Sequence, residues 1–188
     1  METSALSAEL VKLAVDGDRR AVDQLLRYLR PLVVKYCRAR VGRSATTADD
    51  VAQDVCLAVL KALPSYREQG RPFLAFVYGI AAHKVADAHR ALARNRAESM
   101  ADVPDQPVRG AGPEEFVLRD ELSGTLGRLL HVLPGKQREI LVLRVVVGLS
   151  AEETAEAVGS TPGAVRVAQH RALGRLRKEI TALSVPIG

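Results

Sequence analysis

The sequence predicts an all-α protein with two small helical domains joined by a flexible linker. Ala, Leu, Arg and Glu, which favour helices, dominate both halves of the 188 residues, and no stretch alternates β-branched with polar residues over a strand length. Between the halves, ADVPDQPVRGAGP at 101–113 holds three prolines and two glycines, a composition that resists regular structure. We therefore expect one domain at 8–96, a linker at 97–113 and a second domain at 114–183.

Two helices are predicted to open the first domain. Apolar residues at helical spacing predict a short helix over 8–15, which stops at an Asp-Gly pair. Asp18 is then placed as the N-cap of a longer helix that runs toward Arg40. Pro31 lies inside this second helix and predicts a kink or a break there.

Two more helices complete the predicted first domain. Thr47 opens the third helix, with Asp50 three residues later in a carboxylate variant of the capping box, and Pro64 stops it. A loop then leads to Pro72, which is predicted as the first residue of a fourth helix running to about Arg96.

The second domain is predicted to begin with a helix from about Glu114, which the Pro-Gly pair at 134–135 breaks. Another helix follows from Lys136 to Val147, and Gly148 ends it. Both segments carry apolar residues at helical spacing.

A helix-turn-helix is predicted after these segments. Ser150 followed by Glu153 forms a capping box before a short helix at 151–158. The next residues, GSTP, supply a glycine to end that helix and a Thr-Pro pair to start another. Two helices joined by a short glycine-containing turn are typical of DNA-binding proteins.

The last helix is predicted to read DNA. Between 162 and 180, five basic residues face one acid, so this segment carries most of the chain's net charge of +5. A recognition helix needs such an arrangement, with cations on phosphates and other side chains at base edges. The alternative is an ordinary solvated basic face. The residues expected to pack inward are Val158, Val165, Leu173, Leu176 and Ile180.

An aromatic cluster is mixed with basic residues in the first domain. Four of the seven aromatic residues fall between 66 and 78, and arginines, lysine and histidines surround and follow them. Rings can stack on unpaired bases while cations follow the phosphates, which is the chemistry of single-strand binding. The alternative is that these rings fill a small core, and we expect about half of them to do so.

An acidic patch is predicted on the third helix. Asp49, Asp50, Gln53 and Asp54 lie near its start, and Asp50 and Asp54 share one face. Like charges at this spacing are mildly unfavourable alone, which favours a basic partner. The alternative is that the carboxylates only cap the helix and complement its dipole.

The composition excludes several classes of protein. No apolar run approaches the ~18–20 residues that span a bilayer, and the N-terminus does not resemble a signal peptide, so we expect a cytoplasmic protein without membrane insertion. Cys37 and Cys56 lie on apolar stretches and are interpreted as small buried hydrophobes. The four histidines lack metal-binding spacing, and no P-loop or GxSxG occurs. No metal, cofactor or enzymatic activity is expected.

Three stretches together resemble the extracytoplasmic-function (ECF, group IV) sigma factors of bacterial RNA polymerase, within the sigma-70 family. ADDVAQDVCLAVLKALPSY resembles sigma region 2.2, FLAFVYGIAAHKVADAHR resembles regions 2.3 and 2.4, and the stretch from LPGKQREI to RLRKEI resembles region 4. The actinobacterial sigma-D type is the most similar. The resemblance implies a region 2 bundle, a region 4 helix-turn-helix and a role in promoter recognition and transcription initiation. It also implies three partners: core RNA polymerase through its β′ and β subunits, promoter DNA, and an anti-sigma factor.

The resemblance further implies roles for single residues. Those expected to dock on the coiled coil of the β′ subunit are Asp50, Gln53 and Asp54. Those expected near the −10 element, including the loop that captures a flipped base, are Tyr66, Arg67, Arg71, Phe76, Tyr78, His83, Lys84, Asp87 and Arg90. Those expected at the −35 element are Arg166, Val167, Ala168, His170, Arg171 and Arg175. His83 departs from the family, in which Asn is usual at that position.

The main alternative is a helix-turn-helix transcriptional regulator of another family, such as a response regulator. That class needs a receiver domain of alternating strands and helices with a phosphorylatable Asp at a strand end. The first half of this chain shows no such pattern, which favours the sigma-factor interpretation.

Overall fold

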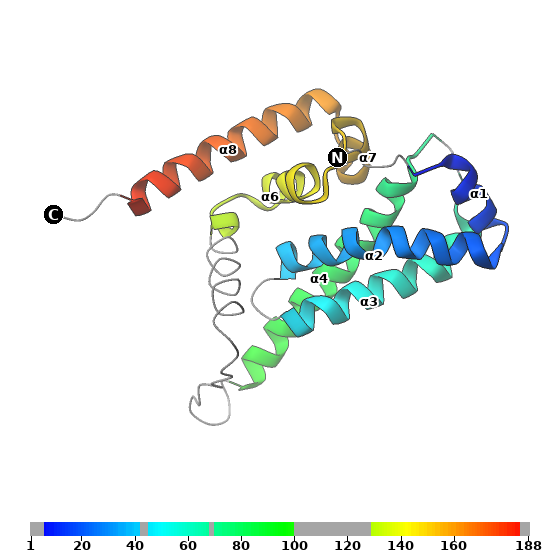
Figure 1. Cartoon of the computed structure of the whole chain (residues 1–188). Helices are drawn as coiled ribbons and strands as arrows, with labels where there is room; N and C mark the ends of the chain where they lie inside the picture. The colour runs from blue at the N-terminus through cyan, green and yellow to red at the C-terminus, as the bar shows by residue number, and fades with distance from the viewer. Residues whose placement is uncertain (1–5, 42–44, 68–69, 100–128, 185–188) are drawn as a thin grey trace.

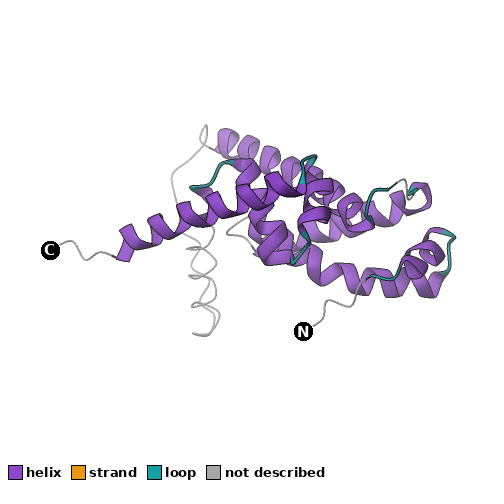
Figure 2. Cartoon of the chain, turned by 90° about the horizontal axis from the view of Figure 1, so that it is seen from above, coloured by secondary structure: helices purple, strands orange, loops and turns teal. Residues whose placement is uncertain are grey.

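The computed structural model describes residues 6–41, 45–67, 70–99 and 129–184, and these contain helices and loops but no strand. Figure 2 shows this helical composition from above. The elements in chain order are α1 (Ala8–Val15), α2 (Arg19–Val41), α3 (Ala45–Ala62), a 3₁₀ turn η1 (Leu63–Ser65), α4 (Phe73–Ser99), α6 (Gly135–Leu141), a π-helical segment η2 (Val142–Val147), α7 (Ala151–Val158) and α8 (Pro162–Ser184).

The first two helices begin where their caps predict. The Asp18 carboxylate accepts a hydrogen bond from the Ala21 amide at 2.8 Å, as expected of an N-cap. Of the kink or break predicted at Pro31, the break is wrong, because α2 continues through the proline to Val41. Buried side chains on both sides of the proline, including Leu29 and Val33, hold the helix against its neighbours and override the local penalty.

Helix α3 starts earlier than predicted. It begins at Ala45, so its first turn holds no acidic residue and the capping box proposed for Thr47 and Asp50 is wrong. The Asp49 carboxylate instead accepts two hydrogen bonds from the Arg38 guanidinium, both at 2.9 Å. This pair joins α3 to α2, and the hydrogen bonds from Arg38 lower the pKa of Asp49.

The helices of the first half form a bundle, with α2, α3 and α4 packed side by side and α1 across one end (Figure 1). Helix α4 starts one residue after Pro72 and runs to Ser99, three residues past the predicted end. Most of the predicted helix from Glu114 and most of the 97–113 linker lie outside the described residues, and residues 129–131 at the end of that helix are helical.

The second half contains a change of helix type that the sequence did not predict. The helix expected over 136–147 is α-helical only to Leu141 and continues as the π-helical segment η2. Gly148 then adopts a φ of +90°, and the amides of Gly148 and Leu149 both donate to the Leu143 carbonyl. A glycine is required here because other side chains rarely adopt this conformation.

The apolar core extends across both halves of the chain. One cluster of buried residues includes Leu29 and Val33 of α2 together with Leu141, Val142 and Val147 of α6 and η2. The two halves therefore lie against each other in this structure, with α6, η2 and α7 over α2 and α4 (Figure 1).

Within the described part of the chain, no helix is both long and apolar enough to cross a membrane.

Cys37 is expected to resist iodoacetamide at pH 8 in the folded protein, while the half-buried Cys56 reacts slowly. Burial, more than the nearby Cys56 and Asp49, raises the pKa of the Cys37 thiol to about 12, and only the thiolate reacts readily. Burial also raises the pKa of Cys56. Mass spectrometry before and after unfolding in guanidinium chloride measures both sites. Equal labelling of the two cysteines in the folded protein would contradict the description of Cys37 as buried and Cys56 as half-buried.

Candidate nucleic-acid interface

The helix-turn-helix is built as the sequence predicts. The Ser150 hydroxyl accepts from the Glu153 amide at 3.0 Å, and the Glu153 carboxylate accepts from the Ser150 amide at 2.8 Å, which completes the capping box of α7. Gly159 ends α7 at a φ of +60°. The Thr161 hydroxyl then accepts from the Ala164 amide at 3.2 Å and starts α8. A buried group beneath the turn, the helix-turn-helix core, comprises Ile140, Ala151, Ala155 and Val165.

Helix α8 turns its basic side chains outward. Four of the six residues predicted to meet a −35 element are exposed cations or a histidine, and Val167 is 50% exposed. Ala168 is half-buried against the helix-turn-helix core. Val165 is buried as predicted, whereas Ile180 is 48% exposed and not packed inward, because the last turns of α8 extend past the domain (Figure 1).

One residue beside α8 was missed by sequence reasoning. Glu152 of α7 forms an ion pair with Arg166 at 2.7 Å, and both side chains are exposed, at 61% and 60%. A hydrogen bond from its own backbone amide, more than Arg166, lowers the pKa of Glu152. The fourteen-residue separation crosses the turn, so no local pattern could have paired these two residues. The pair orients the Arg166 guanidinium at the start of α8.

A second polar stripe lies on α4. His83, Asp87 and Arg90 are exposed at spacings of three and four residues, with Lys84 half-buried beside them. Arg90 donates to the Asp87 carboxylate along the helix. The structure therefore places four of the residues predicted near a −10 element along one helix, three of them exposed and Lys84 half-buried.

The aromatic residues predicted for the same role are mostly in the core. Tyr66 and Phe73 are buried with ring centroids 5.1 Å apart, and Phe76 is half-buried with its centroid 5.0 Å from Tyr66. Tyr78 is buried against Tyr36 at 5.2 Å, and burial is the main cause of its raised pKa. In this conformation Tyr78 and Tyr66 are not on the exposed stripe of α4.

The segment before α4 is held by short-range hydrogen bonds. The Tyr66 hydroxyl donates to the Arg71 carbonyl at 2.8 Å, and Arg67 donates to the Pro64 and Tyr66 carbonyls at 2.9 and 3.0 Å. Gly70 has a φ of +74°, a conformation that favours glycine. Arg67 and Arg71 are exposed, so their guanidinium groups lie at the surface of this segment.

The acidic patch on α3 is exposed and unengaged. Asp50, Gln53 and Asp54 point to solvent, and within the described part of the chain no ion pair engages either carboxylate. Both carboxylates lie beyond the first turn, so the capping explanation does not account for them. Leu57, one turn further along the same face, is 47% exposed. The patch therefore combines negative charge with apolar surface.

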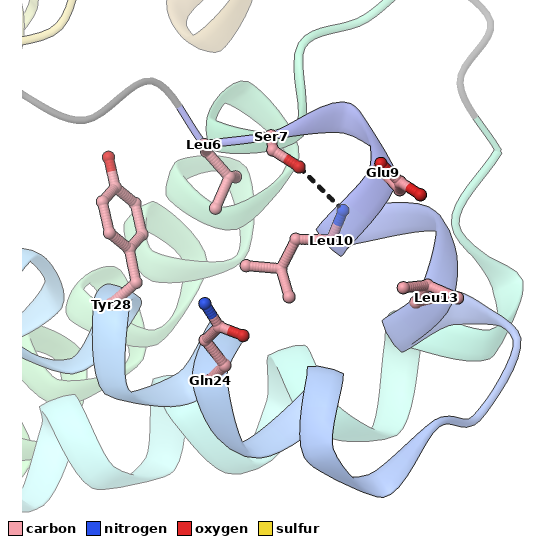
Figure 3. A pocket seen from close by; sticks show the side chains of 7 residues that line it. All are labelled: Leu6, Ser7, Glu9, Leu10, Leu13, Gln24 and Tyr28. Atoms are coloured by element: carbon pink, nitrogen blue, oxygen red, sulfur yellow. Dashed lines mark hydrogen bonds between the residues drawn. The ribbon is translucent and has the colours of Figure 1, made fainter.

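Two hollows in the described structure lack the features of a catalytic or metal site. One, of about 340 Å³, lies between α1 and α2, where Leu6 and Leu10 face Tyr28 and Gln24 and the Ser7 hydroxyl accepts from the Leu10 amide (Figure 3). The other, of about 480 Å³, lies between the two halves. No group of three or more His, Cys, Asp or Glu side chains gathers to hold a metal among the described residues.

Comparison with family models gives two matches. The model for Sigma-70 region 2 matches residues 25–95, and the model for Sigma-70 region 4 matches residues 123–176. The first covers α3 and most of α2 and α4, and the second covers α6, η2, α7 and α8 as far as residue 176.

Individual proteins match over nearly the whole chain. The ECF RNA polymerase sigma factor SigD of Mycobacterium tuberculosis is 62% identical over 92% of this chain and 83% of its own length. The ECF RNA polymerase sigma factor ShbA of Streptomyces griseus is 50% identical over 94% of this chain and 95% of its own length. Among solved structures, CnrH in complex with the cytosolic domain of CnrY superposes with a TM-score of 0.70 and 26% identity, covering 93% of this chain and 96% of that one.

Proposed function

The chain belongs to the extracytoplasmic-function sigma factors of the sigma-70 family. From that premise we propose which of its residues contact core RNA polymerase and which contact promoter DNA. A sigma factor binds core RNA polymerase and directs it to promoter DNA. Asp50, Gln53 and Asp54 dock the region 2 domain at 8–96 on the β′ coiled coil. The observation that supports this assignment is their exposure on one face of α3 without internal ion pairs.

The DNA contacts are divided between two helices. The exposed stripe of α4 and the arginines before it meet the opened −10 strand, because cations and polar groups are gathered there at the surface. The outward face of α8 meets the −35 duplex, in the manner of a recognition helix. Joining both sites in one chain raises the effective concentration of the second contact once the first has formed.

Three further properties follow from the same proposal. The chain acts as a binding subunit without an active site of its own, and it works in the cytoplasm, where RNA polymerase acts. An anti-sigma factor holds it inactive, a proposal supported by CnrH, which was solved with the cytosolic domain of CnrY.

In vitro transcription tests the function directly. Purified actinobacterial core polymerase is incubated with pooled genomic promoter fragments, with and without this protein. Discrete transcripts that require the protein are expected, and their 5′ ends give the −35 and −10 elements. Binding to duplex DNA without any protein-dependent transcript would contradict sigma activity.

Arg171→Ala is expected to weaken binding to a −35 duplex by ~1–3 kcal/mol if the guanidinium contacts a base, and by less if it contacts a phosphate only. Arg171 is exposed on α8, so its removal leaves the domain core intact. Fluorescence anisotropy on matched and mutated −35 duplexes measures the loss and its sequence dependence. Arg27→Ala, on an exposed arginine of α2, is the control. Equal losses for both variants would exclude a specific role for Arg171.

A further inference from the structure

A carboxylate of α7 is paired with a cation on the face of α8 that is proposed to meet the −35 element. The Arg166 Nη2 donates to the Glu152 Oε1 at 2.7 Å, and both side chains are exposed. Glu152 lies in the first turn of α7, and Arg166 is the fifth residue of α8. The pair therefore holds a guanidinium near the start of the helix, where a recognition helix places the side chains that reach base edges.

Neither capping nor stability accounts for Glu152. The capping box of α7 is complete without it, since Ser150 and Glu153 make both of its hydrogen bonds. An exposed ion pair contributes little to the free energy of unfolding. A carboxylate on a face that meets DNA is also repelled by phosphates, so it weakens binding to every sequence. What remains for Glu152 to supply is the orientation of Arg166.

Arg166 is the side chain in the first two turns of α8 that is best placed to read a base. Val167 and Ala168 carry no hydrogen-bonding group. The Gln169 Oε1 accepts from the Arg144 Nε of η2 at 3.0 Å, so this amide is turned toward its own domain. Within the described part of the chain only the Nη2 of Arg166 is engaged, and its other N–H donors are available to the O6 and N7 atoms of a guanine.

We propose that Glu152 is a positioning residue for −35 recognition, whose carboxylate holds the Arg166 guanidinium in the orientation that pairs with a guanine and contacts no base itself. The proposal rests on the assignment of α8 to the −35 element. A guanidinium that is already oriented loses less conformational freedom when it pairs with a base. The charge of Glu152 lowers binding to matched and unmatched DNA alike, and the orientation of Arg166 restores it only at a matched site.

Selection from promoter fragments with a randomised −35 segment tests this role. The full-length protein is assembled with core RNA polymerase on a promoter identified by in vitro transcription, and the bound fragments are sequenced. Arg166→Ala is expected to lose the preference for one G·C pair. Glu152→Gln should lower the preference at that same pair about fivefold, a part of what a bidentate contact contributes. It should also bind fragments without that pair about twofold more tightly, because a negative charge is removed.

Glu156→Gln is the matched control, because it makes the same change of charge at an exposed position of the same helix. No ion pair engages Glu156 among the described residues, so its base preferences should equal those of the unmodified protein. Both substitutions leave the capping box of α7 intact, and circular dichroism establishes that each variant is folded. In an Arg166→Ala background, Glu152→Gln should cause no further loss of preference.

Three results would overturn the positioning role. They are a base preference unchanged in Glu152→Gln or in Arg166→Ala, an equal loss in Glu156→Gln, and a further loss when Glu152→Gln is added to Arg166→Ala. The last would mean that Glu152 acts on DNA without Arg166. Failure of the proposed function is seen separately, as the absence of any transcript that requires the protein.

Discussion

Asp54→Lys is expected to lower the affinity for core RNA polymerase by roughly 30-fold or more, since reversing a charge at a docking surface costs about 2–5 kcal/mol. Asp54 is exposed on α3 and no ion pair engages it among the described residues, so the loss would come from the polymerase contact. The buried face of α3, which includes Val51 and Val55, is unchanged, so the helix should remain folded. Titration of labelled protein with core polymerase measures the affinity.

Two further variants make the Asp54 result specific. Asp54→Asn should give an intermediate loss, because it removes the charge without adding an opposite one. Asp23→Lys reverses an exposed carboxylate on α2, and little change is expected. Core polymerase binding to Asp54→Lys with the affinity of the unmodified protein would exclude this face of α3 as the docking site.

Ile140→Ala is expected to destabilise the helix-turn-helix domain by about 2–5 kcal/mol, the usual cost of removing a large aliphatic side chain from a packed core. Ile140 is 1% exposed, and it is the largest side chain of the helix-turn-helix core, where it meets Ala151, Ala155 and Val165. The small neighbours cannot fill the space it leaves. Urea unfolding followed by circular dichroism measures the stability.

The same domain supplies a control for Ile140. Val145→Ala, at a position 59% exposed on η2, should change the stability by no more than about 0.5 kcal/mol. The Ile140 variant should also lose binding to duplex DNA at temperatures where the unmodified protein binds. Similar unfolding midpoints for the two variants would contradict the packing described for this core.

Local signals in the sequence predicted the helix-turn-helix almost to the residue. The capping box of Ser150 and Glu153, the glycine at 159 and the Thr-Pro pair each act within one helical turn, so they can be read without the fold. Pro31 is the opposite case. Its local effect predicts a break, but burial on both sides keeps α2 continuous, and burial is a property of the whole bundle.

The candidate site residues show the same contrast between features that local sequence predicts and features that depend on packing between distant segments. The exposure of Asp50 and Asp54 follows from the period of α3, and it could be predicted. The burial of Tyr78 against Tyr36 depends on how α4 meets α2, which periodicity does not specify. The hydrogen bond from the Tyr36 hydroxyl to the Glu139 carboxylate joins residues 103 positions apart, so no pattern in the sequence could predict it.

Helix α8 is 23 residues long and carries five exposed cations, Arg166, Arg171, Arg175, Arg177 and Lys178. Each cation that neutralises a phosphate releases counterions condensed on the DNA, so five such contacts give a slope of about −4.5 for log affinity against log salt. This gain in mixing entropy is the same for every DNA sequence. Cations that contact only phosphates therefore add affinity without discrimination, and discrimination between promoters is left to groups that reach base edges.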